Sequence, residues 1–229
     1  MLRPKKKISK RELKQDALVT TYAEITSFYE KHKKNISMAF TAFVVVVIAS
    51  VVFLKNRSEN NEKAMTQLGS IFQFYDNGQY QAAIDGVPER NIAGLRSIVE
   101  NYGNSQAGDI AKFYLASAYY QTGNFDEALK YFEESSPGDE LLAVSRYSGI
   151  GCCYEAQGKH REAAESFEKA ATKNTKDVSA AENLNSAARN YVQAGDKEKA
   201  LELYKRLKKN YSTTSYGRDA DRYIAQLSV

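Results

Sequence analysis

Several residue types that carry chemistry are scarce in this sequence of 229 residues. It has no tryptophan and only two histidines and two cysteines, and it contains no glycine-rich phosphate loop, zinc-ligand spacing or nucleophile elbow. Acidic pairs such as Glu133 with Glu134 are typical of solvated helix ends. We therefore expect a protein that is not an enzyme, with no catalytic residues, no cofactor and no metal site.

The two cysteines, Cys152 and Cys153, are adjacent. Their α carbons are only ~3.8 Å apart across a trans peptide, below the usual range for disulfides. On a helix their side chains also diverge by about 100°. Because they lie mid-helix in a position where small residues are needed, we interpret them as packing residues and expect free thiols.

Charge is absent from one long run, the twenty residues 35–54 between Lys34 and Lys55. At ~1.5 Å per residue, a helix of this length spans about 30 Å, the thickness of a bilayer core. Cleavage as a signal peptide near Ala49 is the alternative. The 34 residues before the run and its length both argue against that, and no nearby cysteine could carry a lipid anchor. The sequence predicts one retained transmembrane helix.

The flanking charges predict the orientation of this helix. Residues 1–34 contain ten Lys or Arg and four acidic residues, whereas the rest of the chain carries a small excess of acid. The positive-inside rule then places the N-terminus in the cytoplasm and the C-terminal domain outside it, in the periplasm of an inner (plasma) membrane protein. The inverted topology is a weaker alternative. In the expected orientation His32 and His160 lie on opposite sides of the membrane and cannot share a metal.

The basic tail needs no nucleic acid to explain it, because positive charge beside a span sets topology and attracts anionic lipid. Ser9 and Glu12 have the spacing of a capping box. Apolar residues then recur at helical spacing and predict an amphipathic helix from about Lys10 to Lys33. This stripe consists of Leu18, Tyr22, Ile25 and Tyr29. Lipid, a second copy or a partner helix could cover the stripe, and a helix resting on the inner leaflet is the favoured interpretation. The oligomeric state is open.

Beyond the span, a glycine pattern repeats four times, at positions 78, 123, 158 and 195, each followed five residues later by alanine. Before the last three glycines, an aromatic residue lies four positions upstream and a small residue seven upstream. Another aromatic residue follows nine positions downstream. Each unit is typical of helix, tight turn and helix, with Gly in a left-handed or cap position. Small residues are needed where the paired helices cross, and the aromatic residues fill the space beside them.

This pattern resembles the tetratricopeptide repeat over residues 59–227, although the family's Trp and terminal Pro are missing. The resemblance implies an all-α solenoid over residues 55–229, after a tail (1–34) and a transmembrane helix (35–54). In the first repeat, residues 85–88 interrupt the second helix, and we expect a bent or lengthened helix that includes Ile92. The last segment, 216–227, has no partner helix and is expected to cap the solenoid.

A narrower resemblance rests on residues 98–109 and 111–119, together with the basic arm and single span. In these features the chain is similar to the bacterial family of the ancillary Sec translocon subunit. That family implies a periplasmic, membrane-tethered module that associates with the translocon and passes emerging polypeptides to chaperones. The expected partners are therefore membrane lipid, translocon subunits, and periplasmic chaperones or client polypeptides. The alternative is an envelope scaffold that recruits division, cell-wall or outer-membrane assembly factors without contacting the translocon.

The expected binding surface is the groove formed by the first helix of each repeat. Offsets of about one residue from the core positions predict its lining. These residues are Phe113, Ser117, Tyr120, Gln121, Ser148, Cys152, Glu155, Glu182, Asn185, Arg189 and Gln193. With Arg189 almost the only base among them, the mixture favours weakly bound polypeptide of mixed character over a strongly acidic peptide. A solvated face without a ligand is the alternative.

Overall fold

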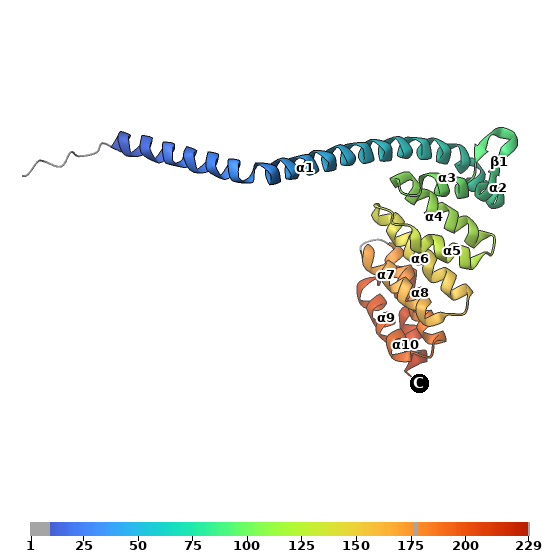
Figure 1. Ribbon diagram of the computed structural model, residues 1–229. Coiled ribbons are helices and arrows are strands. Elements are labelled where there is room, and N and C mark those ends of the chain that lie inside the picture. The colour runs from blue at the N-terminus through green and yellow to red at the C-terminus, as the bar shows by residue number, and fades with distance from the viewer. Residues whose placement is uncertain (1–9, 176–177, 229) are drawn as a thin grey trace, which may run out of the picture. The chain divides into compact units, whose positions relative to one another are not determined.

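The computed structural model describes residues 10–175 and 178–228, with only the backbone described for residues 10–18 and 178. Its residues group into two units, before and after the Asn56–Arg57 bond. A single helix, α1 (Lys10–Asp76), contains both the predicted amphipathic segment and the predicted span and continues into the second unit (Figure 1). Separate helices were expected. No glycine or proline occurs between Lys10 and Leu68, so nothing in the local chemistry breaks the helix. The capping box at Ser9 lies outside the described residues.

In the second unit, successive helices are joined by short connections (Figure 1). After α1 the elements are α2 (Tyr80–Asp85), β1 (Gly86–Val87), the 3-10 turn η1 (Pro88–Arg90), β2 (Ile92–Ala93), α3 (Leu95–Tyr102), α4 (Gln106–Gln121), α5 (Phe125–Glu134), α6 (Glu140–Ala156), α7 (His160–Lys173), α8 (Val178–Gln193), α9 (Lys197–Asn210) and α10 (Ser215–Leu227). Apart from the two short strands, this unit is helical, as predicted.

The four repeat glycines all have positive φ, between 71° and 80°. At Gly123 the N–H donates to the Tyr120 carbonyl at 3.0 Å, and the N–H of Asn124 donates to the Tyr119 carbonyl at 2.9 Å. The same pair of bonds closes the other three turns. This is the Schellman arrangement, in which a left-handed residue lets the chain satisfy the last carbonyls of a helix. The predicted left-handed turns are confirmed.

The first repeat departs from the prediction. Instead of one bent helix, the chain forms an antiparallel pair in which Gly86 faces Ala93 and Val87 faces Ile92. Ile92 is therefore in a strand, not in a helix. Gly86 has a φ of 89°, and a Cβ there would lie 2.5 Å from the Gly94 nitrogen. Two glycines in such close contact allow the hairpin, and Pro88 at its tip cannot continue a helix.

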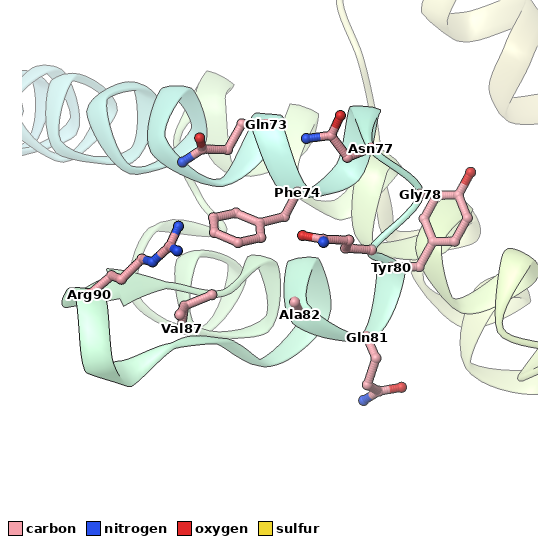
Figure 2. A pocket seen from close by; sticks show the side chains of 10 residues that line it. Gln73, Phe74, Asn77, Gly78, Tyr80, Gln81, Ala82, Val87 and Arg90 are labelled. Carbon is pink, nitrogen blue, oxygen red and sulfur yellow. The ribbon is translucent and has the colours of Figure 1, made fainter.

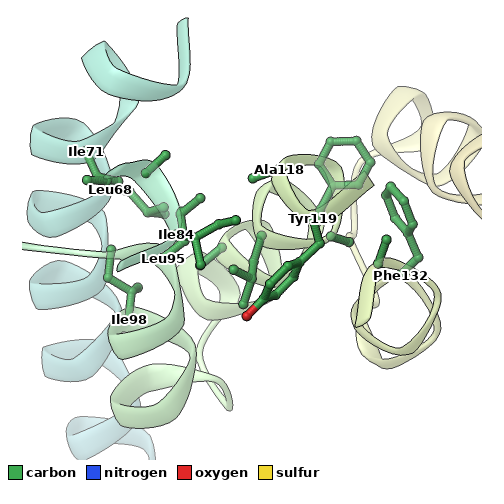
Figure 3. Packing of buried hydrophobic residues seen from close by; sticks show 14 of the residues in the cluster. Leu68, Ile71, Ile84, Leu95, Ile98, Ala118, Tyr119 and Phe132 are labelled. Atoms are coloured by element: carbon green, nitrogen blue, oxygen red, sulfur yellow. The ribbon is translucent and has the colours of Figure 1, made fainter. Parts of the chain in front are cut away.

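The C-terminal end of α1 forms the first helix of the first repeat. Leu68 and Ile71 are fully buried against Ile84 and the α3 residues Leu95 and Ile98, as Figure 3 shows. The Asn61 side chain also accepts a hydrogen bond from the Ala107 N–H at 2.8 Å, at the start of α4. This region of α1 is thus part of the repeat core.

Helix α6 approaches both its neighbours through glycines. A Cβ on Gly149 would lie 2.5 Å from the Phe132 ring of α5, and one on Gly151 would lie 3.0 Å from the Phe167 ring of α7. Phe132 and Phe167 are nearly fully buried. The aromatic residues nine positions after the turn glycines therefore occupy the space that these small residues leave, as the sequence pattern indicated.

Replacing Gly149 by Ala is expected to destabilise the repeats, because overpacking of a core costs about 1–3 kcal/mol. Gly69→Ala is a matched control within a helix, since no atom lies within 4 Å of the position that its added methyl group would take. There the substitution should stabilise the folded protein by roughly 0.5–1 kcal/mol, because alanine loses less conformational entropy than glycine when the helix forms. Urea unfolding of the full-length protein in detergent, followed by circular dichroism, measures both. A higher midpoint for both variants would contradict the packing.

Candidate functional site

A cleft of about 430 Å³ lies between α6 and α8, the first helices of two successive repeats. Its lining includes five of the predicted groove residues, Ser148, Cys152, Glu155, Glu182 and Arg189. The further lining residues are Leu141, Val144, Ser145, Phe167, Ser179, Asn183 and Ser186. This cleft is the candidate functional site.

The polar side chains of the cleft are held by hydrogen bonds. The Ser148 hydroxyl lies 2.7 Å from Asn183 Oδ1, and Asn183 Nδ2 donates to the Ser179 carbonyl at 2.9 Å. Asn183 is only 5% exposed. Its amide is therefore oriented before any ligand arrives, which lowers the entropic cost of binding.

The ion pair of the cleft lies at one end. Arg189 donates to Glu155 Oε1 at 2.8 Å across the two helices, and both side chains remain partly exposed. Glu182 lies two helical turns before Arg189 on α8, is exposed, and gives the cleft one more acid than base. At the other end Leu141 is 57% exposed. Hydroxyl and amide groups between a charged end and an apolar end can bind the backbone of an extended polypeptide and one apolar side chain.

A smaller cleft of about 180 Å³ adjoins the first and shares Arg189 with it. It contains the predicted residue Gln193 and is otherwise mostly apolar, with Val192, Tyr204, Tyr223 and Leu227 in its lining. The rings of Tyr204 and Tyr223 stack with centroids 4.7 Å apart. The capping helix α10 therefore lines this smaller cleft as well as covering the core.

The structure does not place the other predicted residues in these clefts. Phe113 is 9% exposed and packs edge-on against Phe132, so it belongs to the core. Ser117 is half-buried on α4 and outside both cleft linings. The Tyr120 ring contacts Phe125, at 5.4 Å between centroids, and Gln121 is exposed at the end of α4. Asn185 is half-buried and lies outside the cleft lining. Asn183 and Ser186 line the cleft in its place.

A larger pocket of about 730 Å³ lies in the first repeat, between the end of α1 and the hairpin. The Arg90 guanidinium lies over the Phe74 ring, 5.9 Å from its centroid, whereas Gln81 points away (Figure 2). The hairpin provides Val87 and Arg90 to this pocket. Sequence reasoning missed it, because a helix was expected where the hairpin forms.

No group of three or more His, Cys, Asp or Glu side chains in residues 19–175 and 179–228 is placed to hold a metal ion. Cys152 and Cys153 are free thiols, the first half-buried in the cleft and the second fully buried. Burial raises the pKa of Cys152 above its usual value and that of Cys153 to about 12. Both are therefore neutral thiols near pH 7.

Comparison with known proteins agrees with this fold. Tetratricopeptide repeat family models match residues 109–176 and 150–214. Two crystal structures of nearly identical TPR-like repeats from a Podosopora anserina putative kinesin light chain, one of them a variant with a single substitution, align with TM-scores of 0.53 and 0.54. Each is 18% identical in sequence, and the alignments cover 73% of this chain and 85–86% of theirs. No curated protein matches the chain in sequence.

The chain therefore contains tetratricopeptide repeats, which form a protein–protein interaction module. Membership of the Sec translocon subunit family stays a hypothesis from the sequence.

The raised thiol pKa values predict slow alkylation of the native protein. At pH 8 iodoacetamide should label Cys152 slowly and Cys153 hardly at all, because alkylation requires the thiolate and access to it. Labelling should accelerate as the pH rises, and both cysteines should react fully in denaturant. Mass spectrometry of the labelled peptides measures the rates. Fast native labelling of Cys153 at pH 8 would contradict its burial.

Proposed function

We propose that this protein is a single-pass, membrane-anchored interaction module that binds polypeptide segments in the cleft between α6 and α8. The observation that carries the proposal is the cleft itself, where preoriented Ser and Asn groups lie between a charged end and an apolar end. Tetratricopeptide repeats bind protein partners in general. An extended segment of mixed composition fits this lining better than a strongly acidic one, because Arg189 is its one base.

Membrane anchoring is supported by the exposure of the apolar run. Among the described residues, one helix segment, Val19–Asp76, is long and apolar enough to cross a membrane by length and composition, with a mean hydropathy of 2.6 in its most apolar window. Side chains such as Phe40, Phe43 and Ile48 are about three-fifths exposed. An apolar surface of this extent is unfavourable in water and is well placed in lipid.

The orientation follows from the charges of the tail. We place the N-terminus in the cytoplasm and the repeats in the periplasm of an inner membrane, in accordance with the positive-inside rule. On this basis we assign the protein to the accessory, chaperone-like components of protein translocation, with the repeats contacting exported polypeptides. The similarity to the ancillary translocon family in arm, span and repeats supports this assignment.

Reversing the charge of Arg189 should abolish partner binding in the cleft. Arg189→Glu removes the bond to Glu155 and gives the cleft a third acid. Arg161→Glu is a matched control, because Arg161 forms a similar exposed ion pair, with Asp196 at 3.2 Å, away from the cleft lining. Exposed pairs contribute only about 0–1 kcal/mol, so both variants should fold. Proteins cross-linked to each variant in membranes provide the measurement. Equal loss or equal retention of partners would contradict a cleft site.

The side chains of the predicted span distinguish a translocon component from a simple membrane tether. Replacing residues 35–54 by a generic Leu/Ala helix should preserve anchoring but lose translocon subunits from the detergent extract, because specific helix contacts need small and polar residues such as Thr41 and Ser50. Co-purified proteins are identified by mass spectrometry. Envelope assembly factors recovered equally with both spans would instead establish a tethered scaffold.

A further inference from the structure

The N-terminal part of α1 carries an apolar stripe that no other described residue covers. Tyr22, Ile25 and Tyr29 are 71%, 61% and 53% exposed, and the stripe continues through His32 to Ile36 at the start of the apolar run. These five positions are separated by three, four, three and four residues. A stripe of this kind in an unbroken helix needs a partner that follows it along its axis.

The spacing of the stripe is compatible with a helical partner. Alternating steps of three and four residues repeat every seven, and a straight helix drifts only about 20° per heptad from that repeat, so the stripe can face one partner helix along its whole length. In heptad terms Tyr22, Tyr29 and Ile36 form one row, and Ile25 and His32 form the other. A helix resting on lipid would have the same spacing, but α1 has no break between Lys34 and Ile36 at which it could turn from the span onto a membrane surface.

The charges are arranged so that two copies of this helix do not repel each other. Glu24, Glu30, Lys31 and Lys34 all lie outside the two rows and their flanking positions. Lys33 lies at a flanking position and is paired with Glu30 of its own helix at 3.0 Å. Val19 and Phe28, both exposed, widen the apolar face on either side. Two copies paired along the stripe would therefore bring no like charges together across the two rows.

Membrane insertion sets the direction of pairing. Copies of one chain cross a membrane in the same orientation, so their α1 helices are parallel, with each residue at the same depth as its counterpart. Rows of equivalent residues then meet without a change of register. A second copy is the one partner whose stripe is certain to have the same length, period and depth.

We propose that the stripe of Tyr22, Ile25, Tyr29, His32 and Ile36 is a homodimer interface, at which two copies of α1 pair as a parallel coiled coil that continues into the span. This inference rests on the proposed membrane anchoring. It goes beyond the proposed cleft site, because the dimer would present two clefts to one client or to two.

Cysteine cross-linking of the full-length protein in isolated membranes tests the interface. Ile25→Cys and Tyr29→Cys lie on the stripe, whereas Ala23→Cys and Ser27→Cys lie on the same turns of the outer face. Two differently tagged copies of each variant are co-expressed and oxidised with copper phenanthroline. The unmodified chain gives the background from Cys152 and Cys153.

The stripe variants should shift to twice the monomer mass in a reducible band that carries both tags, and the outer-face variants should not. Equal cross-linking of all four positions would indicate random collision and overturn the proposal, as would an absence of cross-links. A product of another mass would assign the stripe to a different protein and equally overturn the homodimer. Sedimentation of the same membranes after alkaline extraction tests anchoring separately. Protein that stays in the pellet without cross-links refutes only the dimer, and protein that leaves it refutes the anchoring as well.

Discussion

The repeat unit depends on missing side-chain volume where its helices cross. Gly149 and Gly151 let α6 contact the Phe132 and Phe167 rings directly. At the other crossings, fully buried alanines leave room for the neighbouring helix. Because the rings fill the space beside each crossing, small and large residues have to alternate between neighbouring helices. The separation of α6 and α8, and therefore the cleft between them, follows from this packing.

The cleft combines rigidity with moderate polarity. Its Ser and Asn side chains are held by hydrogen bonds within the protein, and its single Arg is already paired with Glu155. A ligand must therefore compete with an existing ion pair, whose exposed position keeps that cost small. Such a site favours binding that is weak and tolerant of sequence, which suits a module that meets many different polypeptides and releases them.

Helix α1 carries exposed apolar residues along one part of its length and buried apolar residues along another. Between residues 19 and 56 its apolar side chains are mostly exposed, and from Ala64 onward its apolar residues Leu68, Ile71 and Phe74 are buried in the repeats. The absence of glycine and proline over most of this length keeps the helix continuous although the environment of its side chains changes. The same helix thus serves the proposed anchor, the proposed dimer interface and the first repeat.

The sequence by itself determined the turns, the packing residues and the apolar run, because left-handed glycines, crossing points and uncharged segments are local properties with a fixed spacing. The sequence did not determine the hairpin after α2, because that hairpin depends on the close contact between the backbones of Gly86 and Gly94. It also placed Phe113 and Asn185 in the groove, whereas the structure buries the first and moves the second out of the lining. One residue on a helix is a rotation of about 100°, so only tertiary packing decides which side chains face the cleft.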